Sequence, residues 1–173
     1  MITLVLGGAR SGKSRYAERL ASNSQLPVLY IATATALDDE MSARIAHHQT
    51  QRPSEWALCE CPLQLAETLA HESQKPQCIL VDCLTLWLNN QLFHYPQQDF
   101  SLLFKQLIDS LQNSQAQIIF VANEVGLGII PLGEISRQFV DEAGRLNQAL
   151  AQRADTVFFI AAGLPLQLKG DAV

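Results

Sequence analysis

The residues best suited to chemistry lie near the N-terminus, in the run Gly7-Gly8-Ala9-Arg10-Ser11-Gly12-Lys13-Ser14. This run matches the pattern G-x-x-x-x-G-K-[ST] at every fixed position. In that pattern the backbone N–H groups point at phosphate oxygens, the lysine reaches the β- and γ-phosphates, and the hydroxyl takes a Mg²⁺ position. The sequence therefore predicts a nucleoside triphosphate site here, with Lys13 as a catalytic residue and Ser14 as a metal ligand.

A carboxylate that could complete this site is Asp82, which ends the apolar run Ile79-Leu80-Val81-Asp82. A carboxylate at the carboxyl end of a buried strand is where a P-loop fold holds Mg²⁺ or one of its waters. We expect Asp82 to be the second metal ligand. A role as a simple cap of the strand end is the alternative.

A histidine pair lies in a segment with a helical pattern, Leu37 to His48. Arg44 and His48 are spaced i and i+4, so both lie on one stripe of a helix, and Arg52 extends that stripe if the helix continues. Neutral imidazole is a competent nucleophile toward phosphorus near neutral pH. A solvated helix face is the alternative. Metal chelation by His47 and His48 is disfavoured, because adjacent helical side chains point about 100° apart.

Strand and helix patterns alternate along the chain. Apolar, β-branched runs predict strands, and their lack of polar alternation is typical of a parallel sheet buried on both faces. Periodic apolar positions predict helices between the strands. The expected strands are Ile2–Leu6, Val28–Ala32, Cys78–Val81, Ile118–Ala122 and Thr156–Ala161, with helices from Tyr16 to Ala21, Phe100 to Leu111 and Glu134 to Arg153. We predict one α/β domain over residues 1–173, with Asn89–Asp99 and Asn123–Gly133 as its least regular segments.

Composition narrows the function classes. The chain has 173 residues, 48% of them apolar, and a net charge of −5, which argues against a broad nucleic-acid surface. No apolar run approaches the roughly 20 residues of a membrane span, and no basic leader precedes the first strand, so we expect a cytoplasmic protein. The four cysteines have no metal or redox spacing and are expected to be small core residues. A signalling GTPase is disfavoured, since no N-K-x-D motif is present.

Four motifs in order make the sequence resemble a known family. They are the P-loop through Arg15, Tyr30-Ile31-Ala32-Thr33, the segment from Leu37 to Trp56 with His47-His48 and Arg52-Pro53, and Asn123-Glu124-Val125-Gly126 followed by Ala143-Gly144-Arg145-Leu146-Asn147. This order, over nearly the whole chain, resembles the bifunctional adenosylcobinamide kinase/adenosylcobinamide-phosphate guanylyltransferase family.

The resemblance implies a RecA-like sheet and two reactions of cobalamin biosynthesis and salvage. The first phosphorylates adenosylcobinamide with ATP or GTP, and the second transfers GMP from GTP to adenosylcobinamide phosphate through a GMP-histidine intermediate. It places the nucleophile in the segment with Arg44; we choose His48, with His47 as the alternative. It also implies nucleotide contacts outside the P-loop from Ala32, Thr33, Ala34, Gln49, Thr50, Gln51, Arg52, Glu60 and Asp82.

The resemblance further implies a homo-oligomer, with a trimer expected, and small corrinoid substrates as the partners. Asn123 and Glu124 follow a strand at the edge where an α/β fold places its ligands, and we expect them to position corrinoid or guanine. A small-molecule P-loop kinase without guanylyl transfer is the alternative function. One departure concerns Asp82, where some relatives carry Glu.

Overall fold

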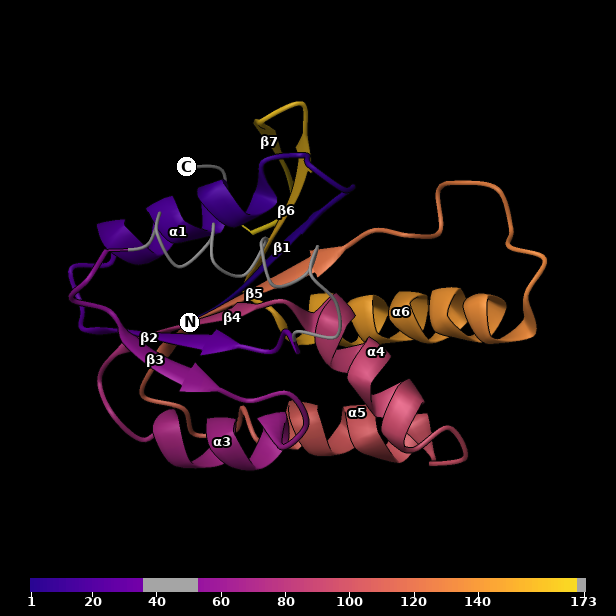
Figure 1. Cartoon of the computed structure of the whole chain (residues 1–173). Helices are drawn as coiled ribbons and strands as arrows, with labels where there is room; N and C mark the ends of the chain where they lie inside the picture. Colours follow the sequence, from indigo (N-terminus) through magenta and orange to yellow (C-terminus); the bar gives the residue numbers. More distant parts are fainter. Residues whose placement is uncertain (36–52, 171–173) are drawn as a thin grey trace.

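The computed structural model describes residues 1–35 and 53–170 of the chain. Their strands form one seven-stranded sheet in the order β3-β2-β4-β5-β1-β6-β7 (Figure 1). All neighbouring strands are parallel except β7, which pairs antiparallel with β6. The strands are β1 (Ile2–Gly7), β2 (Val28–Ala32), β3 (Ala57–Glu60), β4 (Cys78–Asp82), β5 (Gln117–Asn123), β6 (Thr156–Ala161) and β7 (Leu164–Lys169).

Helices cover both faces of the sheet, as the sequence predicts. They are α1 (Lys13–Asn23), α3 (Leu65–Glu72), α4 (Leu84–His94), α5 (Phe100–Asp109) and α6 (Glu134–Arg153). Helix α1 packs Ala17 and Ala21 against one face, and α3 to α6 pack against the other (Figure 1). The predicted α/β class with a mostly parallel sheet is confirmed.

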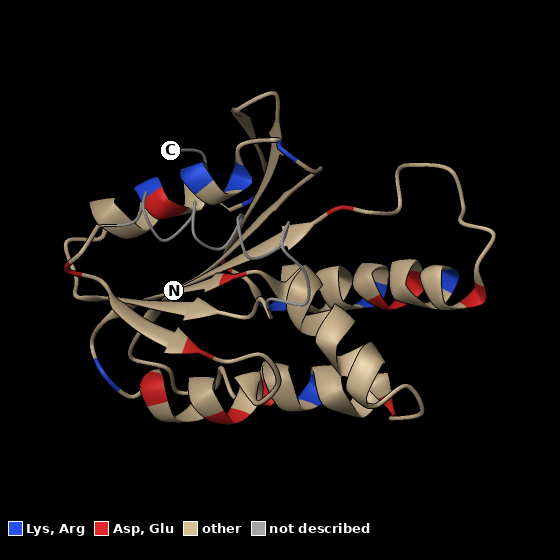
Figure 2. Cartoon of the chain, viewed as in Figure 1, with Lys and Arg blue, Asp and Glu red and all other residues tan. Residues whose placement is uncertain are grey.

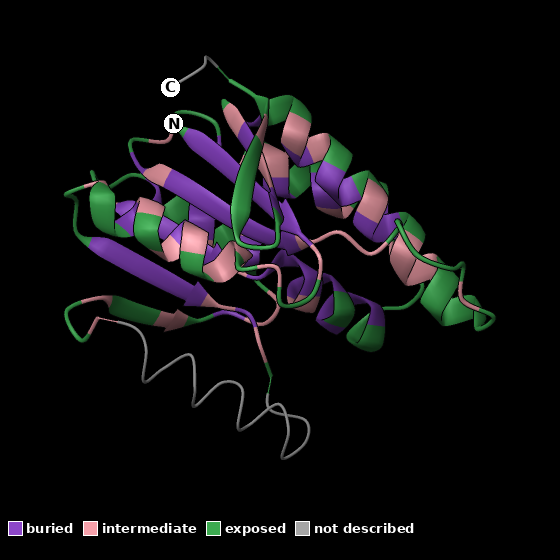
Figure 3. Ribbon diagram, turned by 90° about the horizontal axis from the view of Figure 1, so that it is seen from above, coloured by how far each residue is buried: buried purple, intermediate pink, exposed green. Residues whose placement is uncertain are grey.

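Every residue of β1 and the first four residues of β4 are buried (Figure 3). These interior strands lie between two layers of helices, so side chains on both of their faces are apolar. For this reason the sequence could predict them from their composition alone. Parallel pairing brings the carboxyl ends of β1, β4 and β5 to the same edge of the sheet. This is the edge from which the P-loop emerges.

The prediction that Asn89–Asp99 is irregular was wrong for its first half. Helix α4 continues to His94, and its polar residues Asn90 and Gln91 are buried. Their side chains donate to backbone carbonyls, Asn90 to Thr33 at 2.8 Å and Gln91 to Leu63 at 2.8 Å. Amides that are satisfied in this way can lie inside a packed helix, although the sequence pattern favours a loop.

The sequence did not predict the strands β3 and β7 or the helices α3 and α4. Strand β3 is short and mostly exposed, and β7 exposes Leu164, Leu166 and Leu168. Both lie at the edges of the sheet, where one-sided burial weakens the apolar signal. Sequence periodicity is therefore least informative at these two edges.

The segment between β5 and α6 contains no helix or strand, as predicted for Asn123–Gly133. It projects from the body with the first turns of α6 (Figures 1 and 3). Its apolar side chains are exposed, with Leu127 at 81%, Ile129 at 98% and Leu132 at 98%. Among the described residues, no helix has the length and hydropathy needed to cross a membrane.

Candidate active site

The P-loop leaves the sheet at Gly7 and ends at Gly12, where α1 begins. Gly12 is the N-cap of α1 and has φ +93°, a left-handed conformation that favours glycine. Its lack of a side chain leaves the first N–H groups of α1 without a side-chain cap. These N–H groups and the helix dipole form an anion site at the start of α1.

Gly7 is required by close packing. A Cβ atom at this position would lie 2.7 Å from the carbonyl oxygen of Ile160 and 2.5 Å from the Ser11 hydroxyl oxygen. Both separations are shorter than real Cβ contacts. The first glycine of the motif therefore allows the loop to fold directly over the end of β6.

Backbone contacts hold the rest of the loop in place. The Gly163 N–H, in the turn between β6 and β7, donates to the Ser11 carbonyl at 2.8 Å, and the Glu124 N–H donates to the Gly7 carbonyl at 3.1 Å. The Lys13 ammonium donates to the Gly8 carbonyl at 3.2 Å. The lysine side chain thus folds back over its own loop, on the side where a phosphate group would accept the same donor.

The charge around this loop favours an anion. Helix α1 carries three cations, Lys13, Arg15 and Arg19, and one carboxylate, Glu18, and Figure 2 shows more blue than red along it. The first turn of α1 has no acidic residue. In a chain with net charge −5, this is a local concentration of positive charge at the site where a triphosphate is expected.

Asp82 ends β4 at the same edge of the sheet, and β5 lies between β4 and the P-loop strand β1. The Tyr30 hydroxyl donates to the Asp82 carboxylate at 3.3 Å and orients it. Burial and, to a smaller extent, the Asp82 carboxylate raise the pKa of the neighbouring Cys83 to about 11, while the Lys13 ammonium lowers this pKa. Because β1, β5 and β4 are parallel neighbours, the P-loop that carries Lys13 and the Asp82 carboxylate both lie at the carboxyl edge of the sheet.

The predicted contacts at the end of β2 have a clear structural role. Ala32 ends the strand, and the Thr33 hydroxyl donates to the Cys83 carbonyl at 2.7 Å and accepts from the Cys83 N–H at 2.9 Å. The hydroxyl of Thr33 therefore fastens the end of β2 to the end of β4. Ala34 follows, partly exposed, on the same edge.

Glu60 lies at the carboxyl end of β3 and is exposed. Strand β3 is four positions from β1 in the sheet order, so Glu60 is roughly 19 Å across the sheet from the P-loop. In the sheet order Asp82, at the end of β4, is therefore closer to the P-loop strand β1 than Glu60 is. Glu60 is too distant to contact phosphates held by the loop.

The predicted nucleophile and its neighbours fall outside the described residues. These are His47 and His48, with Gln49, Thr50, Gln51, Arg52 and the helix expected from Leu37 to His48. Of the cysteines, Cys61, Cys78 and Cys83 are buried, in agreement with their predicted role in the core, and Cys59 is partly buried. No group of three His, Cys, Asp or Glu residues suited to a metal occurs in the described part of the chain.

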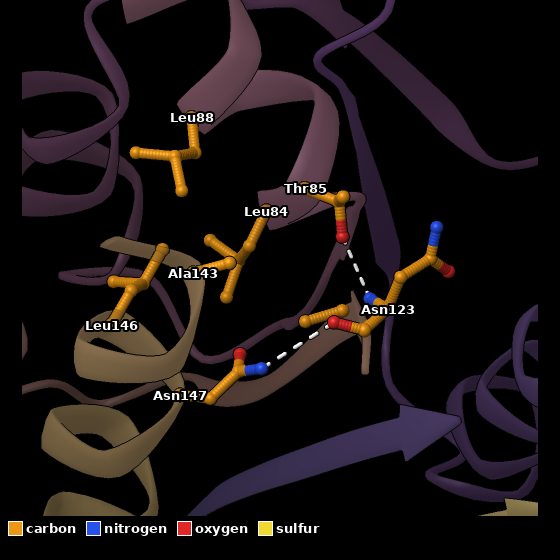
Figure 4. Close-up of a pocket in the computed structure, with 8 residues that line it drawn as sticks. Leu84, Thr85, Leu88, Asn123, Ala143, Leu146 and Asn147 are labelled. Carbon is orange, nitrogen blue, oxygen red and sulfur yellow. Dashed lines mark hydrogen bonds between the residues drawn. The ribbon is translucent and has the colours of Figure 1, made fainter. Parts of the chain in front are cut away.

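Two residues that fix this edge of the sheet were not predicted from the sequence. Thr85 accepts a hydrogen bond from the Asn123 N–H at 2.7 Å, and Asn147 donates to the Asn123 carbonyl at 3.4 Å (Figure 4). They lie along a narrow apolar seam between α4, β5 and α6 that is lined by Leu84, Leu88, Ala143 and Leu146. Asn147 lies in one of the motifs that carry the family resemblance, but its contact with Asn123, like that of Thr85, joins residues remote in sequence, so no local pattern predicts either contact.

Comparison with known proteins decides the family. A family profile described as cobinamide kinase/cobinamide phosphate guanyltransferase matches residues 3–168. The chain belongs to this family. It is 54% identical over 171 residues to the bifunctional adenosylcobalamin biosynthesis protein CobP of Pseudomonas aeruginosa, with 99% of each chain covered. It is also 40% identical over 182 residues to CobU of Salmonella typhimurium, covering 98% of this chain and 100% of that protein.

Membership in the cobinamide kinase/guanyltransferase family confirms the resemblance found in the sequence and makes the protein a transferase of cobalamin biosynthesis. The fold agrees with this family. The RadB recombinase superposes with a TM-score of 0.53 at 15% identity, covering 91% of this chain and 73% of that one. At this identity the likeness concerns the fold alone, and it supports the predicted RecA-like arrangement of the sheet.

Proposed function

We propose that this chain, as one domain over residues 1–173, phosphorylates adenosylcobinamide and then transfers GMP from GTP to the resulting phosphate. The observation that carries the proposal is the P-loop and Asp82 at the same carboxyl edge of the sheet, in a chain of the cobinamide kinase/guanyltransferase family. The proposed donor is ATP or GTP for the first step and GTP for the second. The products are adenosylcobinamide-GDP and pyrophosphate.

In the kinase step, the acceptor hydroxyl of adenosylcobinamide attacks the γ-phosphorus. The new P–O bond forms as the bond from that phosphorus to the β–γ bridging oxygen breaks, and the hydroxyl proton leaves to solvent. The backbone from Gly8 to Gly12 and the Lys13 ammonium hold the triphosphate and neutralise its charge. Phosphoryl transfer depends chiefly on this positioning and charge stabilisation.

Ser14 and Asp82 are the residues that would hold Mg²⁺. Their hydroxyl and carboxylate oxygens are the ligands that this ion prefers, and the Tyr30 hydrogen bond keeps the carboxylate oriented. A site with only two protein ligands fits an ion that keeps several waters and binds substrate phosphates. When bound, the ion neutralises phosphate charge during transfer.

For the second step we propose His48 as the nucleophile, with His47 as the alternative. An imidazole nitrogen attacks the α-phosphorus of GTP, and the bond to the α–β bridging oxygen breaks to release pyrophosphate. The phosphate of adenosylcobinamide phosphate then attacks the same phosphorus and frees the imidazole. Gln49 to Arg52, Ala32 to Ala34 and Glu60 are proposed as nucleotide contacts outside the P-loop. The support is the resemblance to the family. Because Glu60 is too distant to contact the phosphates, its proposed contact is with the nucleoside end of the nucleotide.

We also propose a homo-oligomer, with a trimer expected, that acts on small corrinoids in the cytoplasm rather than on nucleic acid. The exposed apolar loop is the support for self-association, since Leu127, Ile129 and Leu132 are each more than four-fifths exposed. Several large apolar side chains exposed in one loop are typical of an interaction site. Light scattering on a sizing column should give a multiple of the 19.1 kDa chain mass, and I129S/L132S should shift it toward the monomer.

Two variants test the proposed reactions. Lys13→Ala should weaken both steps, because both need the triphosphate held, whereas His48→Ala should abolish GMP transfer and spare much of the kinase activity. Lys105→Ala, on the distant helix α5, is the matched control. Unchanged turnover in Lys13→Ala would contradict the P-loop assignment. Full GMP transfer by both His48→Ala and His47→Ala would instead favour the second candidate function, a plain small-molecule kinase.

A further inference from the structure

Asn123 occupies a central position that the proposed mechanism does not use. It is the last residue of β5, the strand between β1 and β4. In the strand register it lies opposite Gly7, where the P-loop begins, and two residues beyond Val121, which lies opposite Asp82. Its side chain thus leaves the sheet between the phosphate-binding loop and the proposed metal ligand.

Hydrogen bonds hold the backbone at this strand end in place. The Asn123 N–H donates to Thr85, its carbonyl accepts from Asn147, and the next N–H donates to Gly7. Figure 4 shows the side-chain amide turned away from the apolar seam beneath it. Alternation along β5 places it on the same face as Val121, which packs with the residues of α1. That face carries the P-loop helix.

The side-chain oxygen of Asn123 is buried, and among the described residues it has no hydrogen-bond partner. The Ser11 hydroxyl, in the P-loop itself, is in the same condition. A buried polar atom without a partner costs about 1–3 kcal/mol, so such atoms are rare unless a ligand satisfies them. The third such atom among the described residues, the Ser73 hydroxyl oxygen, lies at the end of α3, away from this edge. At the edge itself, the Ser11 hydroxyl can donate, and the Asn123 amide can donate when it turns its NH₂ group into the same position. These two groups indicate a ligand with acceptor oxygens above the strand ends.

We propose that the Asn123 side-chain amide contacts the terminal phosphoryl group of the bound triphosphate, in place of the corrinoid or guanine contact expected from the sequence, and that Asn123 is a catalytic residue of the kinase step. This rests on the proposed function. A side-chain amide can turn to present either its oxygen or its NH₂ group. The NH₂ group would donate to an oxygen of the phosphoryl group as the bond to the β–γ bridging oxygen breaks, and the amide adds no negative charge beside Asp82.

A preorganised donor aimed at the transferred group stabilises charge in the transition state more than in the ground state. Removal of one such donor typically lowers kcat by about 100- to 1,000-fold. The triphosphate remains held by the P-loop and Lys13, so its binding should change little. Asn123→Ala should therefore lower kinase kcat by about 100-fold and leave the Kd for the triphosphate within about threefold.

The variants Asn123→Ala, Asn123→Asp and Asn89→Ala separate this role from a structural one. The aspartate side chain keeps the shape and the acceptor oxygen of asparagine, but it lacks the NH₂ donor and adds a negative charge. The kcat of Asn123→Asp should therefore be at least as low as that of Asn123→Ala. Asn89 is exposed on α4, and its variant should behave like the wild type. A structural role would let Asn123→Asp retain activity, or would weaken nucleotide binding together with kcat.

The measurements are steady-state phosphorylation of adenosylcobinamide and equilibrium binding of a non-hydrolysable triphosphate analogue. A loss in kcat with retained binding, in both Asn123 variants, supports the proposal. Wild-type kcat in Asn123→Ala, or equal losses in kcat and binding, overturns it. Should the wild type fail to phosphorylate adenosylcobinamide, the proposed function fails, and the same variants then test Asn123 through the rate of triphosphate hydrolysis.

Discussion

Replacing Gly7 by alanine should destabilise the nucleotide-free protein by about 1–3 kcal/mol, the usual cost of overpacking a buried position. The new Cβ would lie 2.7 Å from the Ile160 carbonyl oxygen, and this separation must widen by about 0.7 Å to reach the 3.4 Å of ordinary contact. The Ser11 side chain can rotate away. The Ile160 carbonyl is backbone of β6, which is paired with β1 on one side and β7 on the other, so it cannot move alone.

Gly8→Ala is the matched control, because a Cβ atom at Gly8 has nothing within 4 Å. Both variants gain the same small stabilisation from a stiffer unfolded chain, about 0.4–1 kcal/mol, so their difference isolates the clash. Urea unfolding without nucleotide, followed by tryptophan fluorescence from the buried Trp87, measures both. Equal stability of the two variants would refute the close-packing explanation of the first P-loop glycine.

Two further predictions concern titrating groups. Hydrogen bonds from Lys75, His71 and Gln77 lower the pKa of Glu72 from 4.5 to about 2. The ionised Glu72 carboxylate therefore stabilises the folded protein fully above about pH 4.5, and this contribution is lost as the pH falls through 2. Glu72→Gln should lower the free energy of unfolding by about 0.5–1 kcal/mol at pH 7. An equal loss at pH 2 would contradict this explanation. The pKa of Cys83 is raised from 9.0 to about 11 by burial, which lowers its thiolate fraction about 100-fold at pH 7.5. Alkylation followed by peptide mapping should find Cys83 protected in the folded protein and modified in urea, whereas rapid labelling in the folded state would argue against its burial.

The interior of this fold was predictable because its signals are local. Strands β1, β4 and β5 are nearly continuous apolar runs, and the glycines and lysine of the P-loop have fixed spacing along the chain. Helix α4 was not predicted, because the backbone carbonyls that satisfy its Asn90 and Gln91 come from Thr33, Pro62 and Leu63, far away in sequence. Edge strands β3 and β7 were missed because only part of their surface is buried.

The residues of the candidate site also differ in whether local sequence patterns or only the folded sheet reveal them. Lys13 and Asp82 could be proposed as site residues from the sequence, since each ends a recognisable local pattern. The position of Asn123 between them depends on strand order and register, because β5 comes between β1 and β4 only in the folded sheet. No pattern along the chain contains that information. The proposed assignments of His47 and His48 depend on sequence motifs alone.

Intact-protein mass spectrometry after incubation with GTP and Mg²⁺ tests the central claim most directly. Peptide mapping under neutral or alkaline conditions, which preserve a phosphoramidate, then locates any adduct. The proposed function predicts a gain of one GMP on the peptide that contains His47 and His48, lost in His48→Ala. No gain, either with GTP alone or with adenosylcobinamide phosphate also present, would contradict guanylyl transfer through a histidine.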